Sequence, residues 1–188
     1  MHKVFCIIGR SASGKSTIVR RVSENIGLKV LKSYTTRAMR SNETPETTDH
    51  THIPSNAVIN YKDDMVAYTE RVGYCSFATK QQLMDSDLYI INPSGYYDLA
   101  LSVNRMGLDV ELIPVFVTVP YKLNKKRAIE RGDYDSWLEN YEKESSEFDD
   151  FKNSNLIRYR VLNDCDIEEA VMKLENIIRK ELSNVETE

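Results

Sequence analysis

The sequence predicts an α/β fold in which helices cover both faces of a parallel β-sheet. Short, continuous apolar runs are typical of strands that are buried on both faces of such a sheet. Residues 4–8, 88–91 and 113–119 form three runs of this kind. Segments with helical spacing lie between the runs, and strands that alternate with helices favour a three-layer α/β/α arrangement.

The helices are predicted from the spacing of apolar residues. A first helix is expected from about Ser16, with Gly27 as a left-handed stop. A second helix is expected over residues 99–106. Near the C-terminus, residues 159–162 alternate like a more exposed strand, and the apolar stripe in residues 167–178 predicts an amphipathic helix that completes the alternation.

Two stretches interrupt this alternation. Residues 33–80 are polar, irregular and rich in threonine, and residues 121–151 are highly charged and helical in character. Both are expected to be insertions at the edge of the core, where segments that hold substrates are usually found. A length of 188 residues suits a single domain, residues 1–188, that contains both insertions.

The composition argues against several classes of protein. The net charge is −4 and charges of both signs are scattered along the chain, so we expect no nucleic-acid partner. No apolar stretch could span a membrane and no signal peptide is evident, which favours a cytoplasmic protein without a membrane partner. A monomer or a homodimer that binds small-molecule nucleotides is expected. Cys6, Cys75 and Cys165 are far apart and odd in number, so neither a disulfide framework nor a zinc site is indicated.

Residues 9–16, GRSASGKS, match the phosphate-binding pattern G-x-x-x-x-G-K-[ST]. The glycines let backbone N–H groups turn toward phosphates, and the following helix offers its positive N-terminus. Lys15 supplies a mobile positive charge for the β- and γ-phosphates, and the Ser16 hydroxyl is a ligand for Mg²⁺. The order of strand, loop and helix indicates a P-loop NTPase fold. The predicted ATP-binding residues here are Gly9, Ser11, Ala12, Ser13, Gly14, Lys15, Ser16 and Thr17.

The P-loop alone does not distinguish a GTPase, an ATPase and a kinase. No N-K-x-D-like guanine motif follows in a suitable place, which disfavours a GTPase switch. Arg37 and Arg40, preceded by hydroxyl residues, suit a mononucleotide phosphate held by planar, two-pronged donors. Two arginines by themselves are better explained as part of a solvated loop. However, the whole string 33–43, SYTTRAMRSNE, resembles the S-x-T-T-R-x-x-R-x-x-E signature of guanylate kinases.

The resemblance to guanylate kinases runs along nearly the full chain. Residues 92–95 stand where the family has Asp-x-x-Gly, residues 123–132 resemble the start of its lid, and residues 161–171 resemble its closing strand, turn and helix. The resemblance implies that residues 33–80 bind a nucleoside monophosphate and that residues 121–151 form the lid.

The same resemblance implies roles for individual residues. Ser33, Arg37 and Arg40 would hold the acceptor nucleotide, with both arginines on its phosphate, and Asn163 would lie near the adenine of ATP. Phosphoryl transfer needs positioning and charge neutralisation rather than a covalent intermediate. The implied catalytic residues, acting with Mg²⁺, are Lys15, Arg37, Arg127 and Arg131.

Arg127 and Arg131 lie one helical turn apart in the expected lid and therefore project from the same face. By the resemblance they would reach the ATP phosphates when the lid closes. Considered without the P-loop, a charged and solvated helix face is an equal alternative for this pair.

The acceptor pocket departs from the family pattern at three positions. A phosphate-binding Tyr of the family is replaced by His50, whose imidazole can still donate to a phosphate. The base-reading Glu has no secure counterpart, because Ala67 falls near it and Glu70 comes three residues later. The Asp at the sheet edge becomes Asn92, which loses a negative charge that helps to organise Mg²⁺ and the base.

The alignment of the acceptor pocket is open at two places. A second phosphate-binding Tyr falls within residues 72–79, and a His-x-His pair at 50–52 is more readily a hydrogen-bonding or solvated pair than a metal site. The expected acceptor-binding set is Ser33, Arg37, Arg40, His50, Glu70, Tyr74, Ser76, Thr79 and Asn92.

Three functions are compatible with these features. The favoured one is a guanylate or deoxyguanylate kinase that uses ATP. The second is a related P-loop kinase with another nucleotide or a phosphorylated sugar as acceptor, since the altered residues bear on the base more than on the phosphate. The third, a silent guanylate-kinase-like binding module, is disfavoured because such modules usually lose the P-loop Lys, whereas Lys15 is present.

Overall fold

The computed structural model describes residues 1–39, 43–71 and 73–183. These residues contain a five-stranded parallel sheet with the strand order β2-β7-β1-β8-β9. The strands are β1 (His2–Ile8), β2 (Val30–Leu31), β7 (Leu88–Ile91), β8 (Val110–Thr118) and β9 (Tyr159–Leu162). The predicted parallel core sheet is confirmed, and the apolar runs form its three central strands.

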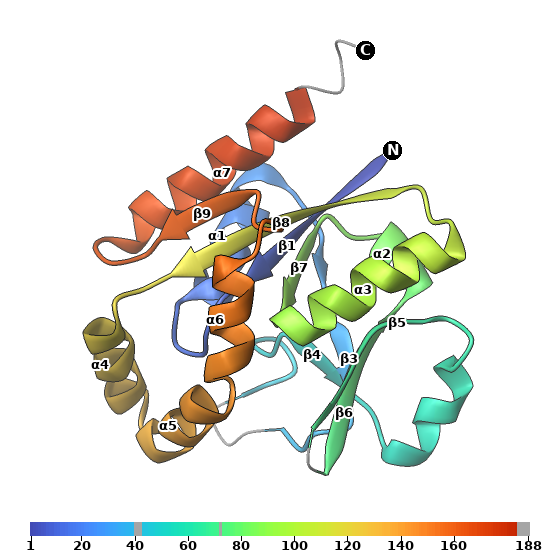
Figure 1. The fold of residues 1–188 in the computed structure, drawn as a ribbon, viewed down its shortest axis with the longest axis horizontal. Helices are drawn as coiled ribbons and strands as arrows, with labels where there is room; N and C mark the ends of the chain where they lie inside the picture. The colour runs from blue at the N-terminus through green and yellow to red at the C-terminus, as the bar shows by residue number, and fades with distance from the viewer. Residues whose placement is uncertain (40–42, 72, 184–188) are drawn as a thin grey trace.

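Helices cover both faces of this sheet, as Figure 1 shows. On one face, α1 (Lys15–Ile26) and α7 (Ile167–Ser183) pack on Phe5 and Ile7 of β1. On the other face, α3 (Pro93–Met106) and α6 (Ser145–Asn153) pack on Cys6 and Ile8. Because alternate residues of a strand point to opposite faces, a continuous apolar run fills both cores at once. The predicted three-layer arrangement is confirmed.

The loop that follows β1 leads directly into α1. This helix ends at Gly27 and α3 ends at Gly107, both in the left-handed conformation, with φ of 72° and 60°. A residue with a Cβ adopts such a conformation at a cost, so glycine is favoured at these ends. Because β1 and β7 are parallel and lead into α1 and α3, the carboxyl ends of these strands and the starts of these helices lie along one edge of the sheet.

Residues 33–80 were expected to be irregular, and this expectation is wrong. They contain a second, four-stranded sheet with the order β4-β3-β6-β5, joined by the short helix η1 (Ser55–Tyr61) and followed by α2 (Lys80–Met84). Its strands are β3 (Ser33–Thr35), β4 (His50–His52), β5 (Met65–Arg71) and β6 (Tyr74–Thr79). The rings of Tyr34, Tyr61 and Phe77 pack together beside it, with centroids 4.6–5.6 Å apart.

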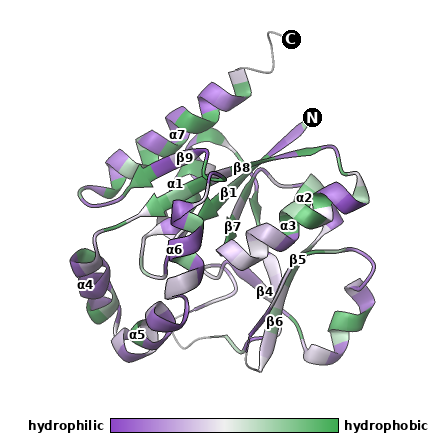
Figure 2. Cartoon of the chain, in the orientation of Figure 1, coloured by the Kyte–Doolittle hydropathy of each residue, from purple (hydrophilic) through white to green (hydrophobic). Residues whose placement is uncertain are grey.

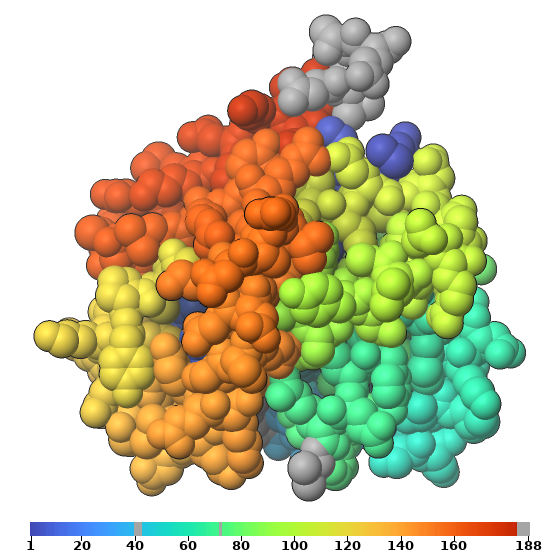
Figure 3. Space-filling view, in the orientation of Figure 1, coloured from blue at the N-terminus to red at the C-terminus, as the bar shows by residue number. Residues whose placement is uncertain are grey.

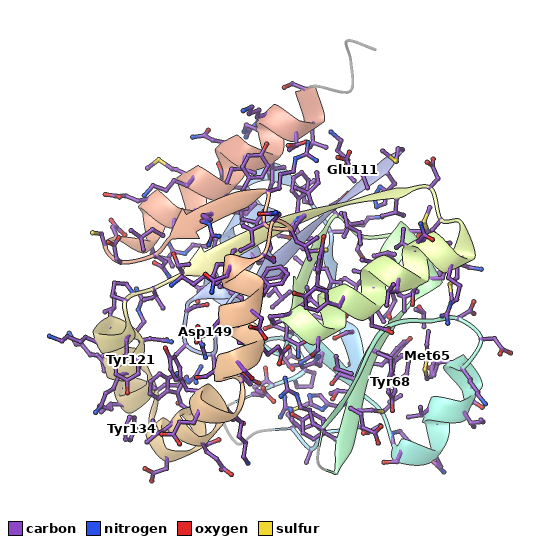
Figure 4. The ribbon with its side chains drawn as sticks, viewed as in Figure 1. Met65, Tyr68, Glu111, Tyr121, Tyr134 and Asp149 are labelled. Atoms are coloured by element: carbon purple, nitrogen blue, oxygen red, sulfur yellow. The ribbon has the colours of Figure 1, made fainter. Side chains whose placement is uncertain are left out.

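Residues 121–151 are helical, as predicted. They form α4 (Tyr121–Arg131), α5 (Tyr134–Lys143) and most of α6. Figure 2 shows that these helices are largely hydrophilic, in contrast to the hydrophobic core strands. Aromatic contacts join α4 to α5: Trp137, which is 1% exposed, lies between Tyr121 and Tyr134, and Figure 4 labels both tyrosines. No helix in the described ranges is long and apolar enough to cross a membrane.

Candidate active site

A cavity of about 470 Å³ lies where the P-loop, the second sheet and the α4–α6 segment meet. Each of these three parts contributes charged or polar side chains to its wall. The wall includes the P-loop residues Gly9, Ser11, Ala12, Ser13, Gly14, Lys15, Ser16 and Thr17. It also includes the predicted acceptor-side residues Ser33, Arg37, His50, Tyr74, Ser76 and Asn92, and the predicted lid residues Arg127 and Arg131.

Two glycines set the close packing of the P-loop. Gly14 has a φ of 86°, and a Cβ on it would come within 2.4 Å of the Asn163 side-chain nitrogen. A Cβ on Gly9 would come within 2.5 Å of the Val117 carbonyl oxygen in β8. A larger residue at position 9 would therefore push the loop away from β8, and one at position 14 would displace the Asn163 amide and adopt an unfavourable backbone conformation.

Lys15 is held inside the loop. Its Nζ donates to the carbonyl of Arg10 at 2.9 Å. Burial lowers the pKa of Lys15 to about 8, although the carboxylates of Asp49 and Glu144 act in the opposite direction. Arg131 adds a smaller repulsion. The loss of solvent therefore outweighs the attraction from nearby carboxylates, and an anionic ligand at this position would stabilise the charged ammonium.

Asn163, the residue expected near the adenine, lies behind the P-loop. Asn163 is 1% exposed and does not belong to the cavity wall. Its amide nitrogen donates to the Ser13 carbonyl at 2.8 Å, and its amide oxygen accepts from Arg127 at 3.5 Å. Asn163, directly after β9, thus contacts the P-loop through its amide nitrogen and α4 through its amide oxygen, and it braces the loop from behind.

The α4–α6 segment, which the sequence predicts to be a lid and which is called the lid segment below, is docked on the P-loop. The guanidinium of Arg10 donates to the Tyr141 carbonyl at 3.1 Å and pairs with Asp149 at 3.3 Å; Figure 4 labels Asp149 on α6. It also lies over the Tyr141 ring, 4.2 Å from the centroid. The indole of Trp137 donates to the carbonyl of Ser11 at 3.3 Å. The helices therefore lie against the loop whose residues are predicted to bind phosphates.

Arg127 and Arg131 reach the cavity from one face of α4, as the spacing predicts. Arg131 donates to the Ser11 hydroxyl at 3.3 Å and pairs with Asp133 at 2.6 Å. The Nη1 of Arg127 is buried and has no hydrogen-bond partner among the described residues. A buried donor of this kind is costly, and an anion in the cavity would satisfy it.

On the acceptor side, Arg37 presents a two-pronged guanidinium. Its Nη2 donates to both carboxylate oxygens of Glu43 at 2.9 Å, and its Nη1 donates to the Ala38 carbonyl at 2.7 Å. Glu43 therefore fixes the plane of a cation that lines the cavity. Arg40, the second arginine of the predicted pair, lies outside the described residues.

The two histidines of strand β4 are hydrogen-bonded within the second sheet. His50 Nδ1 shares a hydrogen bond with the Ser33 hydroxyl at 2.8 Å, and burial lowers the pKa of His50. His52 Nδ1 donates to the Arg37 carbonyl at 2.7 Å. In the described part of the chain, no group of three or more His, Cys, Asp or Glu side chains is arranged to hold a metal ion.

Two residues of the expected acceptor set do not reach the cavity. Glu70 is exposed, and its neighbours Thr69 and Arg71 line the cavity instead. A register shift in β5 between Val66 and Thr69, where Ala67 has a φ of 58°, determines which residues face inward. Thr79 caps α2, because its hydroxyl accepts from the Gln82 backbone at 3.2 Å.

Three charged residues of the cavity wall were missed by sequence reasoning. Asp49 accepts a hydrogen bond from the Ser16 hydroxyl at 2.5 Å. Arg71 pairs with Glu144 at 3.0 Å and so connects the β5–β6 hairpin to the lid segment; Figure 3 shows these two segments side by side. Burial raises the pKa of Glu144 despite this pairing. The position of Asp49 directly before His50 was the one available signal.

Comparisons with known proteins show what this fold is similar to. The structure is similar to the solved structure of guanylate kinase from Anaplasma phagocytophilum, with a TM-score of 0.59 and 16% sequence identity over 96% of this chain and 86% of that chain. No protein-family model matches the sequence, and no curated protein matches it. The arrangement of a P-loop α/β core with two insertions is therefore a guanylate-kinase-like fold.

Proposed function

We propose that this chain is a nucleoside monophosphate kinase that transfers the γ-phosphoryl group of ATP to GMP or dGMP, giving ADP and GDP or dGDP. One observation carries the proposal: a single cavity has the P-loop on one side, the acceptor-side sheet on another and the lid arginines on a third. A cavity built only to hold a nucleotide triphosphate would have no need of the second polar wall.

The residues of this chain would divide the work of transfer between them. Lys15 would hold the β- and γ-phosphates, and Arg127 and Arg131 would neutralise charge that develops on the transferred group. Arg37, with its plane fixed by Glu43, would hold the phosphate of the acceptor in line with that group. Docking of α4–α6 on the loop would exclude water, which would otherwise accept the phosphoryl group.

The donor atoms at the loop fit a magnesium ion. The Ser16 hydroxyl and the adjacent Asp49 carboxylate are hard oxygen donors of the type that Mg²⁺ prefers, and both line the cavity. Ser16 would hold the ion together with the phosphates. When bound, Mg²⁺ supplies positive charge to the β- and γ-phosphate oxygens.

A second candidate is a related kinase whose acceptor carries another base or is a phosphorylated sugar. Ala67 stands near the position of the base-reading Glu, and Glu70 points away from the cavity. Such a wall would discriminate less strongly against other acceptors. The presence of Lys15 in the P-loop disfavours a silent binding module, because such modules usually lose this lysine.

A coupled ADP-release assay with ATP, Mg²⁺ and a panel of nucleoside and deoxynucleoside monophosphates tests the proposal. We expect the highest kcat/KM with GMP or dGMP. Turnover of another acceptor with none for guanine nucleotides would replace the first candidate by the second. An absence of turnover with every acceptor, while ATP still binds, would support the binding module.

A further inference from the structure

Asp49 belongs to the acceptor side of the cavity but contacts the donor side. It immediately precedes strand β4 of the second sheet. His50, the first residue of β4, forms a hydrogen bond with the Ser33 hydroxyl. The Oδ2 of Asp49 accepts from the hydroxyl of Ser16 at 2.5 Å, across the cavity wall. A carboxylate is thereby placed beside the hydroxyl that the P-loop motif assigns to magnesium.

The residue expected to supply negative charge at this edge of the sheet cannot do so. Asn92 follows β7 and acts as the N-cap of α3, where its Oδ1 accepts from the Gly95 backbone at 3.0 Å. Its Nδ2 donates to the Ser94 hydroxyl at 3.1 Å. Both ends of this neutral amide are engaged in the start of the helix.

The second carboxylate of the cavity wall is also engaged elsewhere. Glu144 pairs with Arg71 at 3.0 Å, which holds it toward the β5–β6 hairpin. Of the two described acidic residues that line the cavity, Asp49 is therefore the one that accepts a hydrogen bond from the P-loop. Magnesium is bound in proteins through one or two carboxylates together with substrate phosphates and water.

We propose that Asp49 is a ligand, directly or through one water, of the magnesium ion bound with ATP at Ser16, and that it supplies the negative charge that Asn92 lacks. The proposal rests on the proposed function, because it requires a bound nucleotide. Residues of both the P-loop and the second sheet would then bind the metal ion. Correct placement of strand β4 is then a condition for correct placement of the metal.

Manganese is a suitable probe, because free and bound Mn²⁺ are distinguished by electron paramagnetic resonance without any turnover. We expect Asp49→Asn to weaken Mn²⁺ binding to the protein–ADP complex by about tenfold. Affinity for ADP measured with EDTA should not fall. Asp63→Asn, in an exposed turn, removes the same charge at a distance and should leave Mn²⁺ affinity unchanged. Glu144→Gln should have a smaller effect than Asp49→Asn.

The double variant Asp49→Asn, Asn92→Asp tests the compensation directly. An Asp serves as a helix cap as well as an Asn, so the fold of α3 should be kept. We expect the added carboxylate to restore part of the lost Mn²⁺ affinity. No recovery in a double variant that still binds ADP would overturn the claim that Asp49 supplies the charge that Asn92 lacks.

The outcomes separate this inference from the function on which it rests. Equal Mn²⁺ affinity of the wild type and Asp49→Asn, with ADP still bound, would overturn the inference and leave the proposed kinase untouched. An equal loss in Glu144→Gln would also overturn it, because a general effect of cavity charge would then explain the result. If the wild type bound no ADP or ATP, both the inference and the proposed function would be wrong.

A change of metal preference provides a second measurement that does not depend on Asp49→Asn being well folded. A thiolate ligand favours a soft metal. Asp49→Cys should therefore raise the affinity of the protein–ADP complex for Cd²⁺ relative to Mn²⁺, compared with Asp49→Ser. An identical Cd²⁺ to Mn²⁺ ratio in these two variants would contradict coordination by residue 49.

Discussion

The P-loop and the second sheet line one cavity, but the chain builds them in different ways. The P-loop is a single run of residues 9–17 whose backbone is fixed by its own glycines and by the neighbouring strand and helix. The second sheet brings together Ser33, His50 and Tyr74, which come from three separate strands. The first wall is determined locally, whereas the second depends on strand pairing.

This difference indicates how function can change along the chain. Under the proposed function, the residues that would bind the phosphates of ATP are adjacent in the sequence. Those that would bind the acceptor are distributed over several strands, so single positions such as 67 and 92 could change while the wall persists. Substitutions on the donor side should therefore affect transfer to every acceptor, and those on the acceptor side, apart from Asp49, should affect acceptor binding alone.

The largest effect is expected for Lys15→Ala on the donor side. Loss of the ammonium beside the transferred group should lower kcat by about 10³-fold for every acceptor in the ADP-release assay. Lys62→Ala, in an exposed turn, removes a lysine far from the P-loop and should leave kcat unchanged. Activity of Lys15→Ala close to that of the wild type would exclude the P-loop as the phosphate site.

The next effect is expected for Arg37→Ala on the acceptor side. Removal of the two-pronged cation should raise the KM for the acceptor by about 10²-fold and leave the KM for ATP unchanged. Arg37→Lys keeps the charge but not the planar fork and should recover only part of the affinity. An equal rise in the KM for the acceptor and the KM for ATP, measured by steady-state kinetics, would contradict the assignment of Arg37 to acceptor binding alone.

Asn163→Ala tests whether a residue outside the cavity wall supports ATP binding through the P-loop. The side chain braces the Ser13 carbonyl from behind the loop, so its loss should raise the KM for ATP by about tenfold. Because the amide is outside the cavity wall, GTP as donor should be affected by the same factor as ATP. A selective loss with ATP would instead show direct contact with adenine, as the family resemblance implies.

The smallest effect is expected for Glu144→Gln, at the junction of lid and hairpin. Burial raises the pKa of Glu144, so the folded protein holds the proton more tightly than the unfolded chain does. Protonation of Glu144 stabilises the folded state fully at pH values below the pKa that this group has in the unfolded chain. This stabilisation is lost as the pH rises through the higher pKa that Glu144 has in the folded protein. At neutral pH the carboxylate is therefore a cost, and glutamine should raise Tm by about 2 °C.

Thermal unfolding of Glu144→Gln and wild type across pH checks this sign. The difference in Tm should shrink as the pH falls toward the ordinary range of a carboxyl group, where both side chains are neutral. Asp135→Asn, near the start of α5, is an exposed control for loss of one charge. A lower Tm for Glu144→Gln at neutral pH would mean that the Arg71 pair outweighs the burial of the carboxylate.

The sequence alone determined the parallel core, the P-loop and the ends of α1 and α3. Each rests on local chemistry: apolar runs fill both faces of a buried strand, and glycine adopts left-handed conformations at low cost. The helical character of residues 121–151 was also predictable, and from it followed the shared face of Arg127 and Arg131.

Only the tertiary structure decided the second sheet and the residues that face the cavity. Two of its strands, β3 and β4, have only three residues each, and they pair across a long stretch of sequence, as Ser33 does with His50. In β5 the register shift beside Ala67 turns Thr69 and Arg71 toward the cavity and Glu70 away from it. No pattern in the sequence predicts such a shift. Asp49 on Ser16 and Asn163 behind Ser13 are contacts that arise only when separate strands converge on one loop.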